Sequence, residues 1–200
     1  MLKFSHVASA VVILGLTTAG ARASLIADGL TYTLTESATA NPLTDQFTLN
    51  IAGINGPSDT EGGRYGVQSF AFNQPSNFAS ALAPSGFTES IGGLNANGCN
   101  GTGNFYCFMA ETAPTGPILP ANTSINYVFN VTLSSGTFSG YSPDFKINWD
   151  GTKNHYDLIS ETLTPTPGTP VPEPGSLLLL GTGLVGLGLV GRRKLSKRYL

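Results

Sequence analysis

The amino-acid sequence predicts an all-β fold, an antiparallel β-sandwich with jelly-roll-like topology, flanked by an N-terminal signal peptide and a C-terminal transmembrane helix. Three observations support this prediction. Several segments alternate apolar and polar residues with a period of two, clusters of Gly, Pro, Asn and Ser separate them, and no segment between the two ends has a helical period. A length of 200 residues, of which 40% are hydrophobic, is enough for one domain of ordinary size.

The alternation is clearest at residues 125–133, where Ile, Tyr, Phe, Val and Leu occupy every second position. A strand with this pattern buries one face and exposes the other. The other candidate strands are shorter or less regular, and they lie at 30–34, 47–51, 65–72, 104–110, 145–149 and 155–163. Seven or eight such strands predict one sandwich domain over residues 24–163.

The first 23 residues have the three parts of a secretory signal peptide. Lys3 supplies the positive start, residues 7–16 form an apolar run, and Ala21 and Ala23 give the small-x-small cleavage pattern. We therefore expect signal peptidase to cut after Ala23, so that the exported chain begins at Ser24.

The C-terminal residues form a linker, an apolar segment and a basic tail. Residues 164–175 contain five prolines, which favour an extended linker. Residues 176–191 carry no charge and are just short of the usual length of a membrane span. Because basic residues remain cytoplasmic, the cluster Arg192-Arg193-Lys194 predicts a cytoplasmic tail over 192–200 and export of everything before the span.

The segment Val171-Pro172-Glu173-Pro174, the apolar run behind it and the cluster Arg192-Arg193-Lys194 closely resemble the PEP-CTERM sorting signal. The resemblance covers about thirty residues and implies recognition by an exosortase, an integral-membrane protease or transpeptidase. Cleavage near the Pro-Glu-Pro motif would then release the protein to the outer surface or extracellular matrix of a Gram-negative bacterium that makes exopolysaccharide. The alternative is an uncleaved, single-span membrane anchor.

The two cysteines predict a disulfide. Cys99 and Cys107 enclose a short loop in a chain that is expected to be exported, where disulfides persist. A metal site is less favoured, because no third or fourth soft ligand lies close by in the sequence.

The composition of the central region argues against a nucleic-acid partner and against common enzymes. Residues 24–171 contain three basic and eleven acidic side chains, whereas phosphate binding requires a basic face. His155 is the only histidine in this region, and the Gly-x-Ser-x-Gly and His-Glu-x-x-His motifs are absent. We therefore expect no enzyme activity and no catalytic residue. A glycan-active enzyme with a carboxylate pair is the less favoured alternative.

We expect no cofactor, and calcium is the one metal that the acidic loops could hold. Calcium prefers oxygen ligands, but aspartates that form turns account for the same residues. The acids concerned are Asp59, Glu61, Asp144, Asp150 and Asp157.

A carbohydrate-binding or purely structural role in an exopolysaccharide or biofilm matrix is the main expectation for the mature domain. Aromatic rings on sandwich folds can stack on sugars. We expect Phe145 and Trp149 to fill the core, because they share one alternating face. Tyr141 and Tyr156 are the candidate residues for contact with a glycan.

Overall fold

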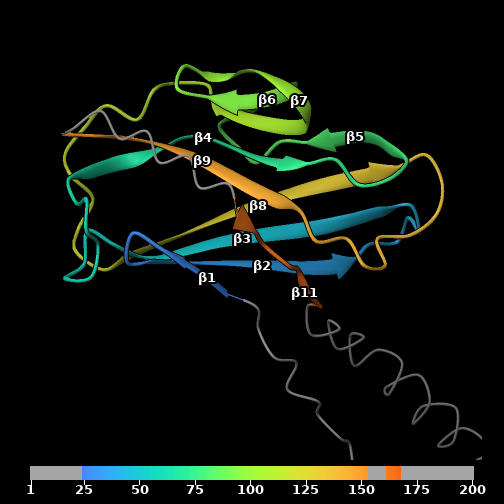
Figure 1. Ribbon diagram of the computed structural model, residues 1–200, viewed down its shortest axis with the longest axis horizontal. Helices are drawn as coiled ribbons and strands as arrows, with labels where there is room; N and C mark the ends of the chain where they lie inside the picture. Colours follow the sequence, from blue (N-terminus) through green and yellow to red (C-terminus); the bar gives the residue numbers. More distant parts are fainter. Residues whose placement is uncertain (1–23, 153–160, 168–200) are drawn as a thin grey trace, which may run out of the picture.

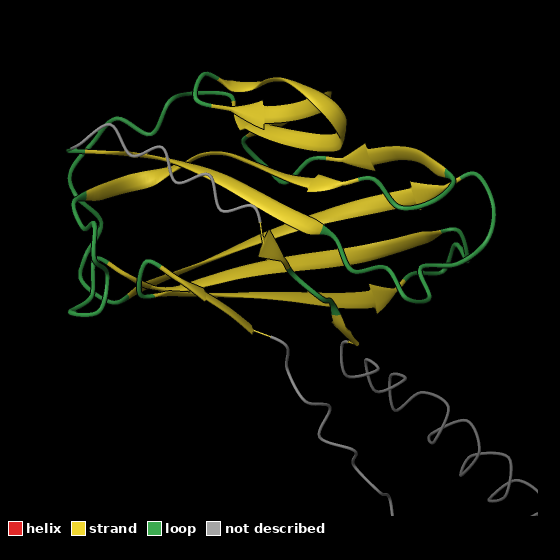
Figure 2. Cartoon of the chain, in the orientation of Figure 1, coloured by secondary structure: helices red, strands yellow, loops and turns green. Residues whose placement is uncertain are grey.

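The protein is a sandwich of two sheets in the computed structural model, which describes residues 24–152 and 161–167 (Figure 1). All regular structure in these residues is strand, and none is helix (Figure 2). The predicted signal peptide, membrane segment, basic tail and most of the linker lie outside the described residues. The described part contains no helix that is long and apolar enough to cross a membrane.

The first sheet, sheet A, has the strand order β1-β2-β3-β8-β5, and a short strand β11 runs parallel to β2. All its other pairings are antiparallel. The bounds of its strands are β1 Ser24–Ala27, β2 Leu30–Ala38, β3 Thr44–Ile54, β5 Phe78–Leu82, β8 Thr123–Leu133 and β11 Thr166–Pro167.

The second sheet, sheet B, has the order β10-β9-β4-β7-β6 and is antiparallel throughout. The bounds of its strands are β4 Arg64–Asn73, β6 Phe87–Asn95, β7 Gly98–Ala110, β9 Asp144–Gly151 and β10 Glu161–Thr162. The predicted all-β sandwich is therefore confirmed. Of the predicted strand at 155–163, the described residues include only the part that contains β10.

Four strands were absent from the sequence prediction, and each lies at a sheet edge or pairs along the edge of β2. They are β1, β5, β6 and β11, and β11 falls within the predicted Pro-rich linker. The sequence of β5 is Phe-Ala-Ser-Ala-Leu, and β6 contains the pair Gly92-Gly93, so neither has the alternation of a half-buried strand.

Aromatic rings fill the space between the two sheets. The ring of Phe129 on β8 lies 5.1 Å from that of Phe108 on β7, 5.5 Å from that of Phe72 on β4 and 5.7 Å from that of Phe47 on β3. The predicted core residues Phe145 and Trp149 are buried in the same cluster. Because these rings come from both sheets, the core depends on the inward face of every central strand.

The β6–β7 hairpin forms a partial third layer, because its tip curls over the outer face of sheet B (Figure 1). Leu94 near the tip packs with Ala71 of β4 and with Cys107. The backbones approach so closely that a Cβ on Gly93 would lie 2.2 Å from the Thr102 carbonyl oxygen. Glycine is therefore required at this position.

The predicted disulfide is present within β7, where Cys99 and Cys107 are bonded with their Cα atoms 5.6 Å apart. It ties the curled tip of the hairpin to the part of β7 that belongs to sheet B. Closing a loop of this size stabilises a fold by about 2–3 kcal/mol on the chain-entropy model.

Candidate functional site

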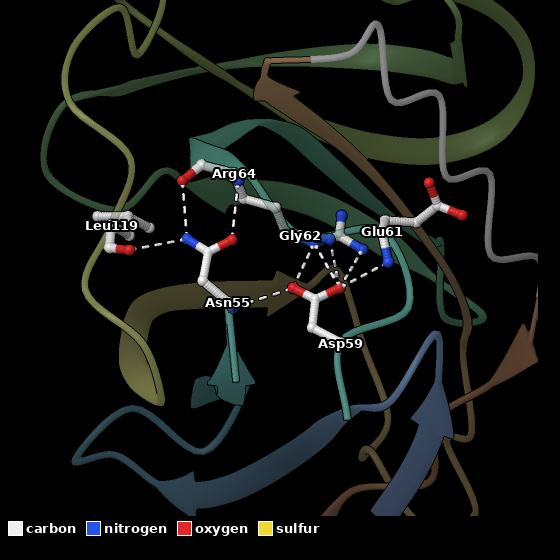
Figure 3. Close-up of polar contacts among 6 residues, drawn as sticks. All are labelled: Asn55, Asp59, Glu61, Gly62, Arg64 and Leu119. Carbon is white, nitrogen blue, oxygen red and sulfur yellow. Dashed lines mark hydrogen bonds and ion pairs between the residues drawn. The ribbon is translucent and has the colours of Figure 1, made fainter. Parts of the chain in front are cut away.

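A buried ion pair holds the loop between β3 and β4 (Figure 3). Arg64 Nε lies 3.1 Å from Asp59 Oδ2, and both side chains have 0% exposure. The guanidinium carbon of Arg64 lies 4.7 Å from the centre of the Trp149 ring on β9. The pair therefore joins the loop to sheet B in a region without solvent.

Asn55 completes this arrangement through its side-chain amide (Figure 3). Its Oδ1 accepts from the Arg64 backbone amide at 2.9 Å, and its Nδ2 donates to the carbonyl oxygens of Arg64 and Leu119. The Asp59 carboxylate also accepts from the backbone amides of Asn55, Glu61 and Gly62. These contacts occupy both carboxylate oxygens, so Asp59 has a structural role and is not free to bind calcium.

Burial alone would raise the pKa of Asp59, but the hydrogen bonds from Arg64, Gly62 and Asn55 outweigh it and hold the pKa below its ordinary value. The folded state therefore favours the charged carboxylate. Its contribution to stability is present above the pKa of an unfolded aspartate and is lost as the pH falls through the lower folded pKa.

We expect Asp59→Asn to lower the free energy of unfolding by about 3–5 kcal/mol at neutral pH, because the buried Arg64 guanidinium loses its counter-charge. Urea unfolding of the wild type and the variant measures this difference. The difference should shrink at acidic pH, where the wild-type carboxylate becomes protonated. Glu111→Gln, at an exposed acid, is the control and should have no effect. A small difference that is independent of pH would contradict the proposed role.

Two carboxyl groups meet at the opposite end of the sandwich. Glu36 on β2 and Asp45 on β3 occupy inward positions, because Glu36 continues the buried series Tyr32 and Leu34, and Asp45 that of Phe47. Burial raises the pKa of Glu36 to about 7, and a hydrogen bond and the charge of Asp45 add to this shift. The folded state therefore favours the protonated form of Glu36.

Tyr141 lies beside this pair and belongs to the core. Its ring packs against Phe47 and Phe138, and its hydroxyl donates to the Asn73 carbonyl oxygen at 2.7 Å. The hydroxyl of Tyr106 lies 3.0 Å from that of Tyr141 and can donate to it. Burial raises the pKa of Tyr141. This packing leaves little of the ring for stacking on a sugar, and the second glycan candidate, Tyr156, lies outside the described residues.

We expect Glu36→Gln to stabilise the protein at pH 8 and to have little effect at pH 4. The raised pKa means that the folded state prefers protonated Glu36, so stability is lost as the pH rises from the ordinary glutamate value through about 7. The amide removes this loss. Thermal unfolding across this pH range measures the effect, with Glu111→Gln as the control. Equal stabilisation at both pH values would argue against a raised pKa of Glu36.

The outer face of sheet A contains no charged residue on its three central strands. Alternation places one side of β2, β3 and β8 in the core, and the other side faces solvent. Cross-strand rows of hydroxyl and amide groups cover this face, and Asn50 Nδ2 donates to Asn126 Oδ1 at 2.8 Å. The outward residues are Thr31, Thr33, Thr35, Ser37, Thr44, Gln46, Thr48, Asn50, Ala52, Ser124, Asn126, Val128, Asn130 and Thr132.

The acids considered for calcium do not assemble into one acidic site. Among the described residues, no group of three or more His, Cys, Asp or Glu side chains could hold a metal ion. Asp144 Oδ1 accepts from the Thr162 hydroxyl, and Asp157 lies outside the described ranges. Asp150 lies on the outer side of β9, apart from Asp59.

The fold defines a class, a two-sheet β-sandwich whose first and last described strands, β1 and β11, both pair with β2. The family comparison adds a sorting signal. A family model described as the PEP-CTERM protein-sorting motif matches residues 170–194. The chain therefore carries a PEP-CTERM sorting motif. The match includes Val171-Pro172-Glu173-Pro174 and Arg192-Arg193-Lys194, and it confirms the resemblance. The motif implies export and exosortase-dependent sorting to the bacterial cell envelope. Neither curated proteins nor solved structures give a significant match.

Proposed function

We propose that this protein is exported, cut after Ala23 and near Pro172-Glu173-Pro174, and retained at the outer surface or in the extracellular matrix of a Gram-negative bacterium. There its sandwich domain is a non-enzymatic component that binds neutral polysaccharide. The match to the PEP-CTERM sorting motif carries the sorting part of this proposal. The structure supports the proposal in two ways.

The positions of the chain ends support processing at a membrane. Ser24 pairs with Thr33, and Thr166 pairs with Thr35, so the first and last strands follow one another along the same edge of β2. The chain therefore enters and leaves the described domain at neighbouring positions along this edge of β2. Pro172 follows Pro167 by five positions, so the two residues lie at most about 18 Å apart. The folded domain is thus compatible with attachment to a membrane through either end.

The uncharged outer face of sheet A supports polysaccharide binding. Its hydroxyl and amide groups offer donors and acceptors at the regular spacing of neighbouring strands, as in the row Thr33, Asn50 and Asn126. A neutral glycan chain can exchange its hydrogen bonds with water for bonds to this face without burying a charge. Because each such bond contributes little, we expect a long polymer to bind better than a short oligosaccharide.

A secreted glycan-active enzyme remains the less favoured candidate. The two acids of a glycosidase lie about 5–9.5 Å apart around an accessible bond. Glu36 and Asp45 instead lie at the end of the core on neighbouring strands, where burial raises the pKa of Glu36. This position suits a structural role.

We expect alanine at Pro172, Glu173 and Pro174 to prevent removal of the tail in a host that has an exosortase. The measurement is the intact mass of protein recovered separately from membranes and medium. The wild type should have the mass of a chain from Ser24 to the Pro-Glu-Pro region, less two hydrogens for the disulfide, plus any attached group.

The control for this experiment is Glu161→Gln with Pro165→Ala, which also removes an acid and a proline but lies before the matched residues. It should be processed normally. A wild-type tail that persists through Leu200 in every fraction would instead favour the uncleaved membrane anchor.

We expect Asn50→Ala with Asn126→Ala to weaken binding to the host's purified neutral extracellular polysaccharide by about two- to tenfold, because two hydrogen-bonding groups are lost. Co-sedimentation of the processed protein with the polymer measures the affinity. Asn97→Ala, at an exposed turn of the β6–β7 tip, is the control. Failure of the wild type to sediment with the polymer would refute the polysaccharide proposal and leave the sorting proposal intact.

A further inference from the structure

The outer face of β4 and β9 is covered in two places. The tip of the β6–β7 hairpin covers one part of it, since Asn148 Nδ2 donates to the Asn95 carbonyl oxygen at 2.7 Å. A Cβ on Gly98 of this tip would lie 3.2 Å from Met109 Sδ and 4.0 Å from Ser69 Oγ. The loop between β7 and β8 covers another part, because a Cβ on Gly66 would lie 2.8 Å from Pro114.

Three buried oxygen atoms belong to neighbouring residues of this covered face. Ser69 Oγ, Asn148 Oδ1 and Asp150 Oδ2 are buried, and within the described part of the chain none has a hydrogen-bond partner. Ser69 is 0% exposed and Asn148 is 1% exposed. The two residues pair across β4 and β9, and Asp150 follows Asn148 by two positions on the same side of β9.

The chemistry of these atoms favours a cation. Buried polar groups normally have partners, and all three oxygens can accept, whereas only the serine hydroxyl can donate. Lys146 lies on the same side of β9, but its ammonium lies over the Phe105 ring, 4.4 Å from the ring centre.

We propose that Ser69, Asn148 and Asp150 form a calcium site between sheet B and the β6–β7 hairpin. Calcium binds carboxylate, amide and hydroxyl oxygens at about 2.3–2.6 Å and tolerates irregular geometry, with water and backbone carbonyls completing six to eight ligands. Magnesium requires stricter octahedral geometry and is the poorer fit. A bound ion would fasten the hairpin tip to sheet B beside the disulfide. This set of ligands differs from the acidic sets that the sequence suggested.

Terbium is a suitable probe, because it is a luminescent calcium analogue that a nearby tryptophan sensitises. Trp149 is the only tryptophan of the chain and lies between Asn148 and Asp150. The experiment uses the processed protein after treatment with a chelator. We expect selective tryptophan excitation to produce terbium emission that saturates with added terbium and that calcium displaces more effectively than magnesium.

Asp150→Asn should weaken terbium and calcium binding by about tenfold or more, because it removes the charged ligand. Ser69→Ala should weaken binding severalfold, and without metal it should melt at or above the wild-type temperature, since an unpartnered hydroxyl has been removed. Glu111→Gln is the control and should bind as the wild type does.

The proposal is overturned if the wild type gives no sensitised emission, or if Asp150→Asn and Ser69→Ala bind as tightly as the wild type. The second result would place the ion elsewhere. Should Asp150→Asn fail to fold, Ser69→Ala decides the matter: weaker binding supports the site, and unchanged binding refutes it.

Discussion

The packing of aromatic rings between the two sheets is the constraint on which the other features depend. Phe129 from sheet A contacts Phe72 and Phe108 from sheet B, so the sheets can adopt only the register in which these rings face inward. A shift of one residue would move a whole strand's apolar side chains to the outside. The inward faces thereby determine which side chains remain on the two outer faces.

The two outer faces differ in a way that suits an exported surface protein. The outer face of β2, β3 and β8 in sheet A is mainly polar and carries no charge, whereas the β6–β7 hairpin covers part of the outer face of sheet B. The hairpin is held by the Cys99–Cys107 disulfide and by close contacts between glycine backbones. The covered side can therefore enclose the oxygen atoms of Ser69 and Asn148, and the open side remains available to a polymer.

Carboxyl groups lie at both ends of this sandwich, with opposite effects on its stability. Asp59 is paired with Arg64, and the two fully buried side chains join the β3–β4 loop to β4 and β9. Glu36 and Asp45 lie at the other end, where β11 pairs with β2 and where burial disfavours the charged form of Glu36. The strand β1 pairs with the first half of β2, so that Ser24 lies opposite Thr33, close to the residues that pair with β11. The first and last described strands thus share one edge of sheet A, away from its outer face.

The sequence alone was sufficient for the features that have a local pattern. Alternation over residues 125–133 predicted β8, the spacing of Cys99 and Cys107 in an exported chain predicted the disulfide, and Val171-Pro172-Glu173-Pro174 with its basic cluster predicted the sorting motif. The edge strands β5 and β6 required the tertiary structure, because they lack a strict period and their partners hold them in place. The same is true of the Asp59–Arg64 pair, the proximity of Glu36 to Asp45, and the juxtaposition of Ser69 with Asn148. These contacts depend on strand register and bulges, which arise when residues distant in the sequence pack around a common core and which no local pattern contains.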